Sequence, residues 1–386
     1  MTTEQRQQEA TQASVAYQLA LTYIGVKTIQ EALAMWGEVP TNLKAGQGAQ
    51  WLAKAVSLIM TRRSRSRELA VAYFRLARAL RTGRTIDDPL KPTPRVVTLD
   101  MLRAEFAALI APEAGLEPAY RPGASAARIA AGELDDEDDE PAQRPQYDPP
   151  ADGEDDDEIP VERLDGFTTE LARQERDAEA EAEEYLEWLG LRNLLAKLDA
   201  VDDTRPAQEV DAARDEAHLH AGTRQAAEAE RIVMDGARAT TWAASDKDGR
   251  VKGYARVSTT GTPCGFCAML ISRGAVYKSA AGAQYSDGDA YHPNCHCIAV
   301  ELFDEQQFAA DPRTALNREY GQLWQDEIAK KYSGKDAVNA WRRLLRARAK
   351  ASALAARSTT PALEATPRER QADQQRERER ERVRVR

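Results

Sequence analysis

The stretches Thr262-Pro263-Cys264-Gly265-Phe266-Cys267 and Tyr291-His292-Pro293-Asn294-Cys295-His296-Cys297 contain all four cysteines of this chain, within a window of 34 residues. Cys264 and Cys267 have the C-x2-C spacing that lets two thiolates turn toward one ion. His292 and Cys295 repeat that spacing, so the two stretches together offer a Cys3His set. Cys297 is a fifth candidate ligand, because in an extended segment it points to the same side as Cys295. The sequence therefore predicts a closed structural zinc site that organises a small domain.

The cysteines allow three other interpretations. Four buried free thiols could fill a small core, and a C-x-x-C redox pair would be expected at a helix start in a βαβ unit. Pro263-Cys264-Gly265-Phe266-Cys267 also matches half of the zinc deaminase signature. The upstream histidines, His218 and His220, lack the glutamate that a deaminase needs, and we expect both at exposed helix positions. No other catalytic template is present, so catalytic residues stay unknown.

Composition indicates a chain that is only partly packed. The 386 residues carry a formal net charge of −10, with 30% charged and 6% aromatic residues. No apolar run approaches the roughly 20 residues of a membrane span, and the first residues lack a secretion signal. We therefore expect no membrane partner and a cytosolic setting. Thiols are kept reduced there, which favours ligands over disulfides.

Periodicity predicts an α+β protein made mainly of long helices, with a small mixed α/β metal-binding domain near the carboxyl end. Apolar spacing predicts helices over 4–37, 50–80, 102–110, 168–199, 208–244 and 313–356, and strands over 251–258 and 298–303. The predicted division is a helical region 1–125, a disordered acidic linker 126–165, a helical region 166–248, the Cys/His domain 249–305, a helical region 306–357 and a disordered Arg/Glu tail 358–386.

Charge is unevenly distributed along the chain. Arg62, Arg63, Arg65 and Arg67 form a dense basic cluster. It predicts either a solvated helix face or contact with nucleic acid or an acidic partner. The arginines that end the tail offer a second nucleic-acid contact. The acidic linker could instead mimic DNA or attract a basic partner.

The cysteine region resembles the carboxy-terminal signature of MuF-like phage head morphogenesis proteins. In that family a C-x-x-C is followed by an Arg-Gly step and a His-x-x-Cys-x-Cys ending. The corresponding residues here are Cys264, Cys267, Arg273, Gly274, His292, Cys295 and Cys297. The family often has arginine between the last two cysteines, where this chain has His296, a sixth possible ligand. The basic-then-apolar stretch that ends at Arg81-Thr82-Gly83 also resembles the amino-terminal region of actinobacteriophage members.

This resemblance implies a minor capsid or head morphogenesis protein of a tailed phage. It would associate with the portal protein, with the major capsid and scaffold proteins and with phage DNA. It would work in the host cytoplasm during assembly and then in the virion capsid. Because some relatives are labelled capsid maturation proteases, a prohead protease that processes capsid or scaffold is the alternative. A nucleic-acid-binding protein is a weaker one.

Overall fold

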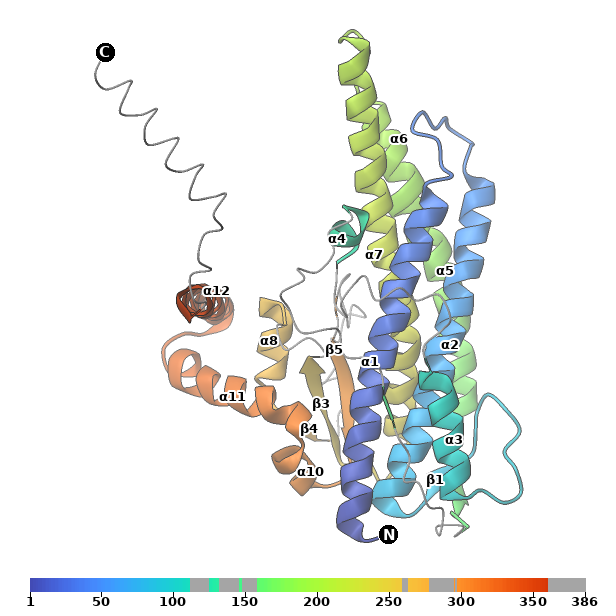
Figure 1. Cartoon of the computed structure of the whole chain (residues 1–386), viewed down its shortest axis with the longest axis vertical. Helices are drawn as coiled ribbons and strands as arrows, with labels where there is room; N and C mark the ends of the chain where they lie inside the picture. Colours follow the sequence, from blue (N-terminus) through green and yellow to red (C-terminus); the bar gives the residue numbers. More distant parts are fainter. Residues whose placement is uncertain are drawn as a thin grey trace, which may run out of the picture. The chain divides into compact units, whose positions relative to one another are not determined.

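A computed structural model describes residues 1–111, 125–131, 146–147, 158–258, 263–277, 295 and 297–359. The chain divides into two compact units, Met1–Leu323 and Trp324–Arg386. Most of the predicted acidic linker and nearly all of the predicted tail lie outside the described residues. The predicted fold class is confirmed: the described chain is mainly helical, with a small sheet toward its carboxyl end (Figure 1). The predicted division into six regions stays a prediction.

Three long helices form the body of the first unit. They are α1 (Thr3–Trp36), α2 (Ala49–Thr82) and α7 (Ala207–Lys247), and they pack against one another (Figure 1). Thr2 and Gln5 start α1 with a reciprocal capping box. Gly83 ends α2 in the left-handed conformation at φ 69°, which glycine adopts without a Cβ clash. The helices predicted over 4–37, 50–80 and 208–244 are confirmed, each to within a few residues.

Shorter helices flank this body. They are α3 (Leu99–Ile110), α4 (Ala126–Ala130), α5 (Phe167–Leu186) and α6 (Asn193–Leu198), with the π-helical segment η1 (Glu187–Arg192) joining the last two. The helix predicted over 168–199 is therefore nearly continuous. Its π-helical turn leaves no trace in the apolar spacing, because one widened turn shifts the pattern by a single residue.

Two sheets accompany the helices. β1 (Thr85–Ile86) pairs in parallel with β2 (Val161–Glu162). The larger sheet is antiparallel in the order β4-β3-β5, with strands Ala275–Tyr277, Gly253–Ser258 and Cys297–Leu302. The two predicted strands are confirmed and β4 was not predicted. Five of the six residues of β3 are buried, since α8 (Gly265–Ile271) contacts β3 and α7 contacts β5.

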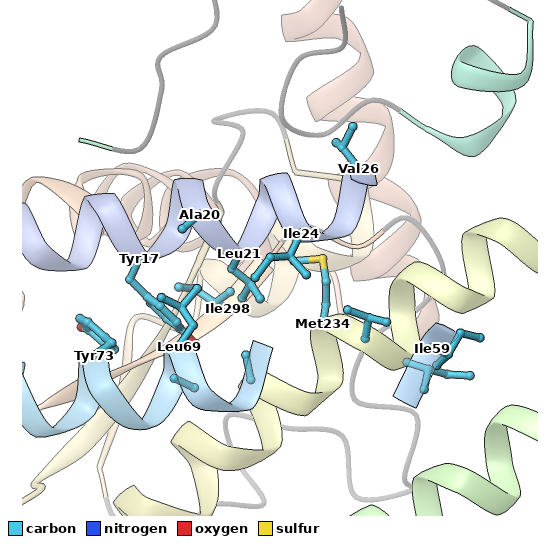
Figure 2. Packing of buried hydrophobic residues seen from close by; sticks show 14 of the residues in the cluster. Tyr17, Ala20, Leu21, Ile24, Val26, Ile59, Leu69, Tyr73, Met234 and Ile298 are labelled. Carbon is cyan, nitrogen blue, oxygen red and sulfur yellow. The ribbon is translucent and has the colours of Figure 1, made fainter. Parts of the chain in front are cut away.

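The core joins the three long helices to this sheet. Figure 2 shows side chains from separate parts of the chain meeting in one cluster, among them Tyr17, Leu21 and Ile24 of α1, Leu69 and Tyr73 of α2, Met234 of α7 and Ile298 of β5. A buried polar path crosses the same region. Tyr73 donates a hydrogen bond to Glu301 of β5 at 2.8 Å, and its hydroxyl lies 2.6 Å from that of Ser14. Helices and sheet of the first unit thus share one interior.

The chain beyond β5 continues in short helices. In the first unit these are α10 (Glu305–Ala310), the 3-10 turn η2 (Pro312–Thr314) and α11 (Ala315–Trp324), whose last residue Trp324 already belongs to the second unit. The second unit contains the π-helical segment η3 (Gln325–Ala329) and α12 (Gly334–Thr359). The prediction of one helical block over 313–356 is thus confirmed with breaks. Among the described helices, none is both long and apolar enough to span a membrane.

The basic cluster on α2 is turned inward, and both interpretations of it are wrong. Arg62 pairs with Glu31 at 2.5 Å, Arg63 with Glu175 at 2.8 Å and Arg67 with Glu175 at 3.1 Å. Their side chains are only 15%, 5% and 12% exposed. Arg65 donates to the carbonyl of Leu109 at 3.0 Å. These arginines tie α2 to α1, α5 and α3 instead of facing solvent or nucleic acid.

The side chain of Trp36 packs closely against α7 at Gly222. A Cβ added at Gly222 would lie 2.3 Å from Cδ1 of Trp36. The indole NH of Trp36 donates to the carbonyl of His218 at 3.0 Å. His218 is half-buried with its Nε2 2.8 Å from the carbonyl oxygen of Val39, whereas His220 is exposed. The expectation of exposure therefore holds for His220 and is wrong for His218.

We expect Gly222→Ala to destabilise the first unit by about 1–3 kcal/mol, because the added methyl group overpacks the Trp36 contact. Gly249→Ala is the matched control, since nothing lies within 4 Å of a Cβ at that position. Chemical denaturation followed by Trp fluorescence measures both. Equal stability of the two variants would contradict the close approach.

Candidate metal centre

Local structure brings the cysteines together from two places. Cys264 is the N-cap of α8, and its Sγ accepts a hydrogen bond from the backbone NH of Cys267 at 3.4 Å. Cys297 begins β5 and is paired in register with Ser258 at the end of β3. Because α8 follows β3 closely in the chain, the pairing of β3 with β5 carries Cys297 and Cys295 to the first turn of α8.

Three of the four thiols form a compact buried group. The sulfurs of Cys267, Cys295 and Cys297 all lie within 4.8 Å of one another, and those of Cys267 and Cys295 are 3.5 Å apart. A tetrahedral zinc site with bonds of about 2.3 Å places its sulfurs roughly 3.8 Å apart. The three residues are 2%, 4% and 2% exposed. Their spacing fits one metal ion, and this group could hold one.

The other predicted ligands lie outside this buried group or outside the described residues. Cys264 is exposed and is not one of the three clustered residues, although its thiol hydrogen-bonds to that of Cys267. His292 and His296 lie outside the described residues, so their part in the site stays a prediction. The C-x-x-C pair does sit at a helix start, as a redox pair would. However, the surrounding sheet is antiparallel, which is not the βαβ setting of a thioredoxin-like motif.

Two buried arginines complete the surroundings of the thiols, and sequence reasoning missed both. Arg256 on β3 points its Nη2 toward Sγ of Cys295 at 3.6 Å and Sγ of Cys267 at 3.9 Å. Arg238 on α7 donates to the backbone carbonyls of Cys295 and Cys297, the latter at 3.1 Å. Both residues are only 3% exposed. A buried guanidinium needs anionic or carbonyl partners, and here the cysteines supply them.

The charges near the thiols favour a thiolate. Hydrogen bonds from the thiols of Cys267 and Cys297, aided by the positive charges of Arg238 and Arg256, lower the pKa of the Cys295 thiol. Burial raises the pKa of Glu230 on α7 to about 8, and the proximity of Cys295 adds to that rise. The sequence did offer a signal for this contact, because Arg256 lies on the predicted strand that precedes the cysteines. Alternation along the predicted strand, however, groups Arg256 with Lys252 and Ser258.

Replacing Arg256 is expected to weaken metal binding without removing a ligand. Arg256→Met should lower the affinity of the thiol group for a metal ion about 10-fold or more, the usual cost of losing a group that contacts metal ligands. Arg250→Met is the matched control, because Arg250 pairs with Glu162 at 2.7 Å and its side chain is 41% exposed. Competition with a chromophoric chelator measures both affinities. Unchanged affinity in Arg256→Met would rule out this role.

The fold and the site together define a class: a helical protein that carries a small thiol-rich sheet suited to one metal ion. Residues 125–323 match the profile of the VG15 protein family. This is more than half of the 386-residue chain, and the chain belongs to that family. The matched stretch contains α7, the β4-β3-β5 sheet and all four cysteines, and it ends where the first compact unit ends.

One curated relative is the Gene 15 protein of Mycobacterium phage D29. It is 29% identical over 133 residues, an alignment that covers 25% of this chain and 47% of that protein. The chain therefore spans about half the length of this relative. No solved structure matches this chain. The comparisons relate the chain to a bacteriophage protein.

Proposed function

We propose that this protein is a minor capsid or head morphogenesis protein of a tailed phage, of the MuF-like type. The observation that carries the proposal is the match of residues 125–323 to the VG15 family, and the similarity to a phage Gene 15 protein adds to it. The cysteine layout adds to it. The Cys-x2-Cys and Cys-x-Cys pairs resemble the MuF-like signature, and three of these four thiols meet in one buried group.

The thiol group is proposed to hold one structural zinc ion. Cys267, Cys295 and Cys297 would supply three ligands, and either Cys264 or His292 the fourth. Thiolate-rich closed sites of four ligands are typical of structural zinc, which would cross-link the start of α8 to the start of β5. Arg256 and Arg238 orient and charge-balance the cysteines from β3 and α7.

Burial of the thiols argues for a structural role over a catalytic one. A catalytic zinc site keeps one position open to water or substrate. The three clustered cysteines are at most 4% exposed, and the polar path through Tyr73 and Glu301 is buried as well. The protein would accordingly act through its surfaces, with the portal, major capsid and scaffold proteins as partners.

Mass spectrometry of purified proheads and mature particles tests this proposal. We expect the chain in both, in few copies, and a large loss of infectious particles when the gene is deleted and complemented with Cys297→Ser. Complementation with Gly249→Ala should restore them. Absence of the chain from both particles, with unchanged yields on deletion, would overturn the proposal.

Co-expression with the capsid and scaffold proteins separates assembly from proteolysis. The expected result is full-length capsid and scaffold chains, whether or not this protein is present. Truncated products that appear only with this protein would favour the prohead protease alternative.

A further inference from the structure

Helix α12 in the second unit carries a concentrated positive charge. Between Gly334 and Ala351 it has six basic residues against one acidic residue, Asp336. All six are exposed: Lys335, Arg342, Arg343, Arg346, Arg348 and Lys350. The whole chain has a net charge of −10, so this helix is a local exception.

The basic side chains share one face of the helix. At about 100° per residue, Lys335, Arg342, Arg343, Arg346 and Lys350 fall within an arc of roughly 100°. A rise of about 1.5 Å per residue spreads them along roughly 22 Å of helix. Arg348 lies outside this arc. We call the five residues the basic face of α12.

The opposite face of α12 is already occupied within the second unit. Ala337, Ala340 and Trp341 are buried, and the Trp341 ring meets that of Trp324 edge-on with centroids 5.3 Å apart. Ile328 of η3 is 2% exposed beside them. An amphipathic helix that binds a membrane inserts its apolar face. Since that face is packed here, the arrangement favours a hydrophilic polyanion over a lipid surface.

The arginines of the basic face differ from other cations of the described chain in their ion pairing. In the described part of the chain, no carboxylate pairs with Arg342, Arg343 or Arg346. In the same unit, Lys330 and Lys331 are paired with Asp326 and Glu327 at 3.9 Å and 2.6 Å. The inward-turned arginines of α2 likewise have partners, which are carboxylates or, for Arg65, a backbone carbonyl. Within the described residues, the basic face is therefore a row of cations that no carboxylate neutralises.

We propose that the basic face of α12 binds the phosphate backbone of double-stranded nucleic acid. A duplex carries one negative charge per about 1.7 Å of axis, so a straight row of cations about 22 Å long meets several phosphates at once. Contact of this kind reads no base sequence. This function goes beyond the proposed role in head assembly and does not depend on the zinc site.

The test measures binding of the full chain to a random 30-base-pair DNA duplex by fluorescence anisotropy between 50 and 200 mM salt. Five phosphate contacts predict a slope of about −4.5 in log K against log salt, a loss of several hundred-fold over this range. The triple variant Arg342→Gln, Arg343→Gln, Arg346→Gln should reduce the slope to about −1.8. Arg173→Gln, Arg176→Gln, Arg205→Gln removes the same charge from exposed positions of the first unit and should bind as wild type.

Two results would overturn the proposal. The first is equal salt slopes for wild type and the α12 triple variant, which would place any binding elsewhere. The second is no binding by the wild type at 50 mM salt, with binding appearing after Asp135–Glu140 and Glu154–Glu158 are neutralised. That outcome would identify the acidic stretches of this same chain as the occupant of the basic face.

Discussion

Cys297→Ser is expected to abolish zinc binding and to destabilise the β4-β3-β5 sheet more strongly than the long helices with which it shares a core. A structural zinc site contributes an apparent free energy of about 10–16 kcal/mol, as large as the stability of a whole domain. Wild-type protein should contain about one zinc ion per chain, measured by elemental mass spectrometry. Hydrogen exchange should show β3, β5 and α8 losing protection in the variant, with α3 as the internal control.

Parallel variants identify the fourth ligand. If Cys264 completes the set, Cys264→Ser will lose zinc and His292→Ala will keep it; the reverse holds if His292 is the ligand. Chelation of wild-type protein should reproduce the Cys297→Ser exchange pattern. Metal-free wild-type protein with a fully protected sheet would show that the thiols are simply packed core residues.

Asp248→Ala is expected to destabilise the first unit by about 1.5–3 kcal/mol, because it removes one of the two carboxylates that pair with the buried Arg78 and leaves Glu162 as the other. Arg78 donates to both carboxylate oxygens of Asp248, at 2.6 Å and 3.2 Å, and their side chains are 1% and 2% exposed. The pair joins α2 to the end of α7. Urea denaturation monitored by circular dichroism measures the loss.

An exposed ion pair provides the control for this prediction. Arg173 pairs with Asp177 at 2.6 Å, but the side chains are 55% and 61% exposed. Asp177→Ala should therefore cost less than about 1 kcal/mol. The double variant Arg78→Met, Asp248→Leu should recover part of the loss, since it removes both charges together. A loss in Asp248→Ala as small as that in Asp177→Ala would refute a strong buried pair.

The helices were predictable because their signal is local. Apolar spacing along residues 4–37, 50–80 and 208–244 is enough to place α1, α2 and α7. β4 was missed because its three residues, Ala275–Tyr277, are too short for an alternating pattern. The inward arginines of α2 were misread for a different reason. A basic run looks the same whether its partners are water or carboxylates such as Glu31 and Glu175, which lie far away in sequence.

The sequence by itself determined that this is a mainly helical protein whose four cysteines lie in two short, ligand-spaced pairs. Spacing and composition are properties of neighbouring residues, so they are readable without a fold. Only the tertiary structure decided that Cys267, Cys295 and Cys297 meet while Cys264 stays exposed, and that Arg256 and Arg238 surround them. Those contacts depend on the register of β3 with β5 and on the packing of α7, which join residues distant in the chain.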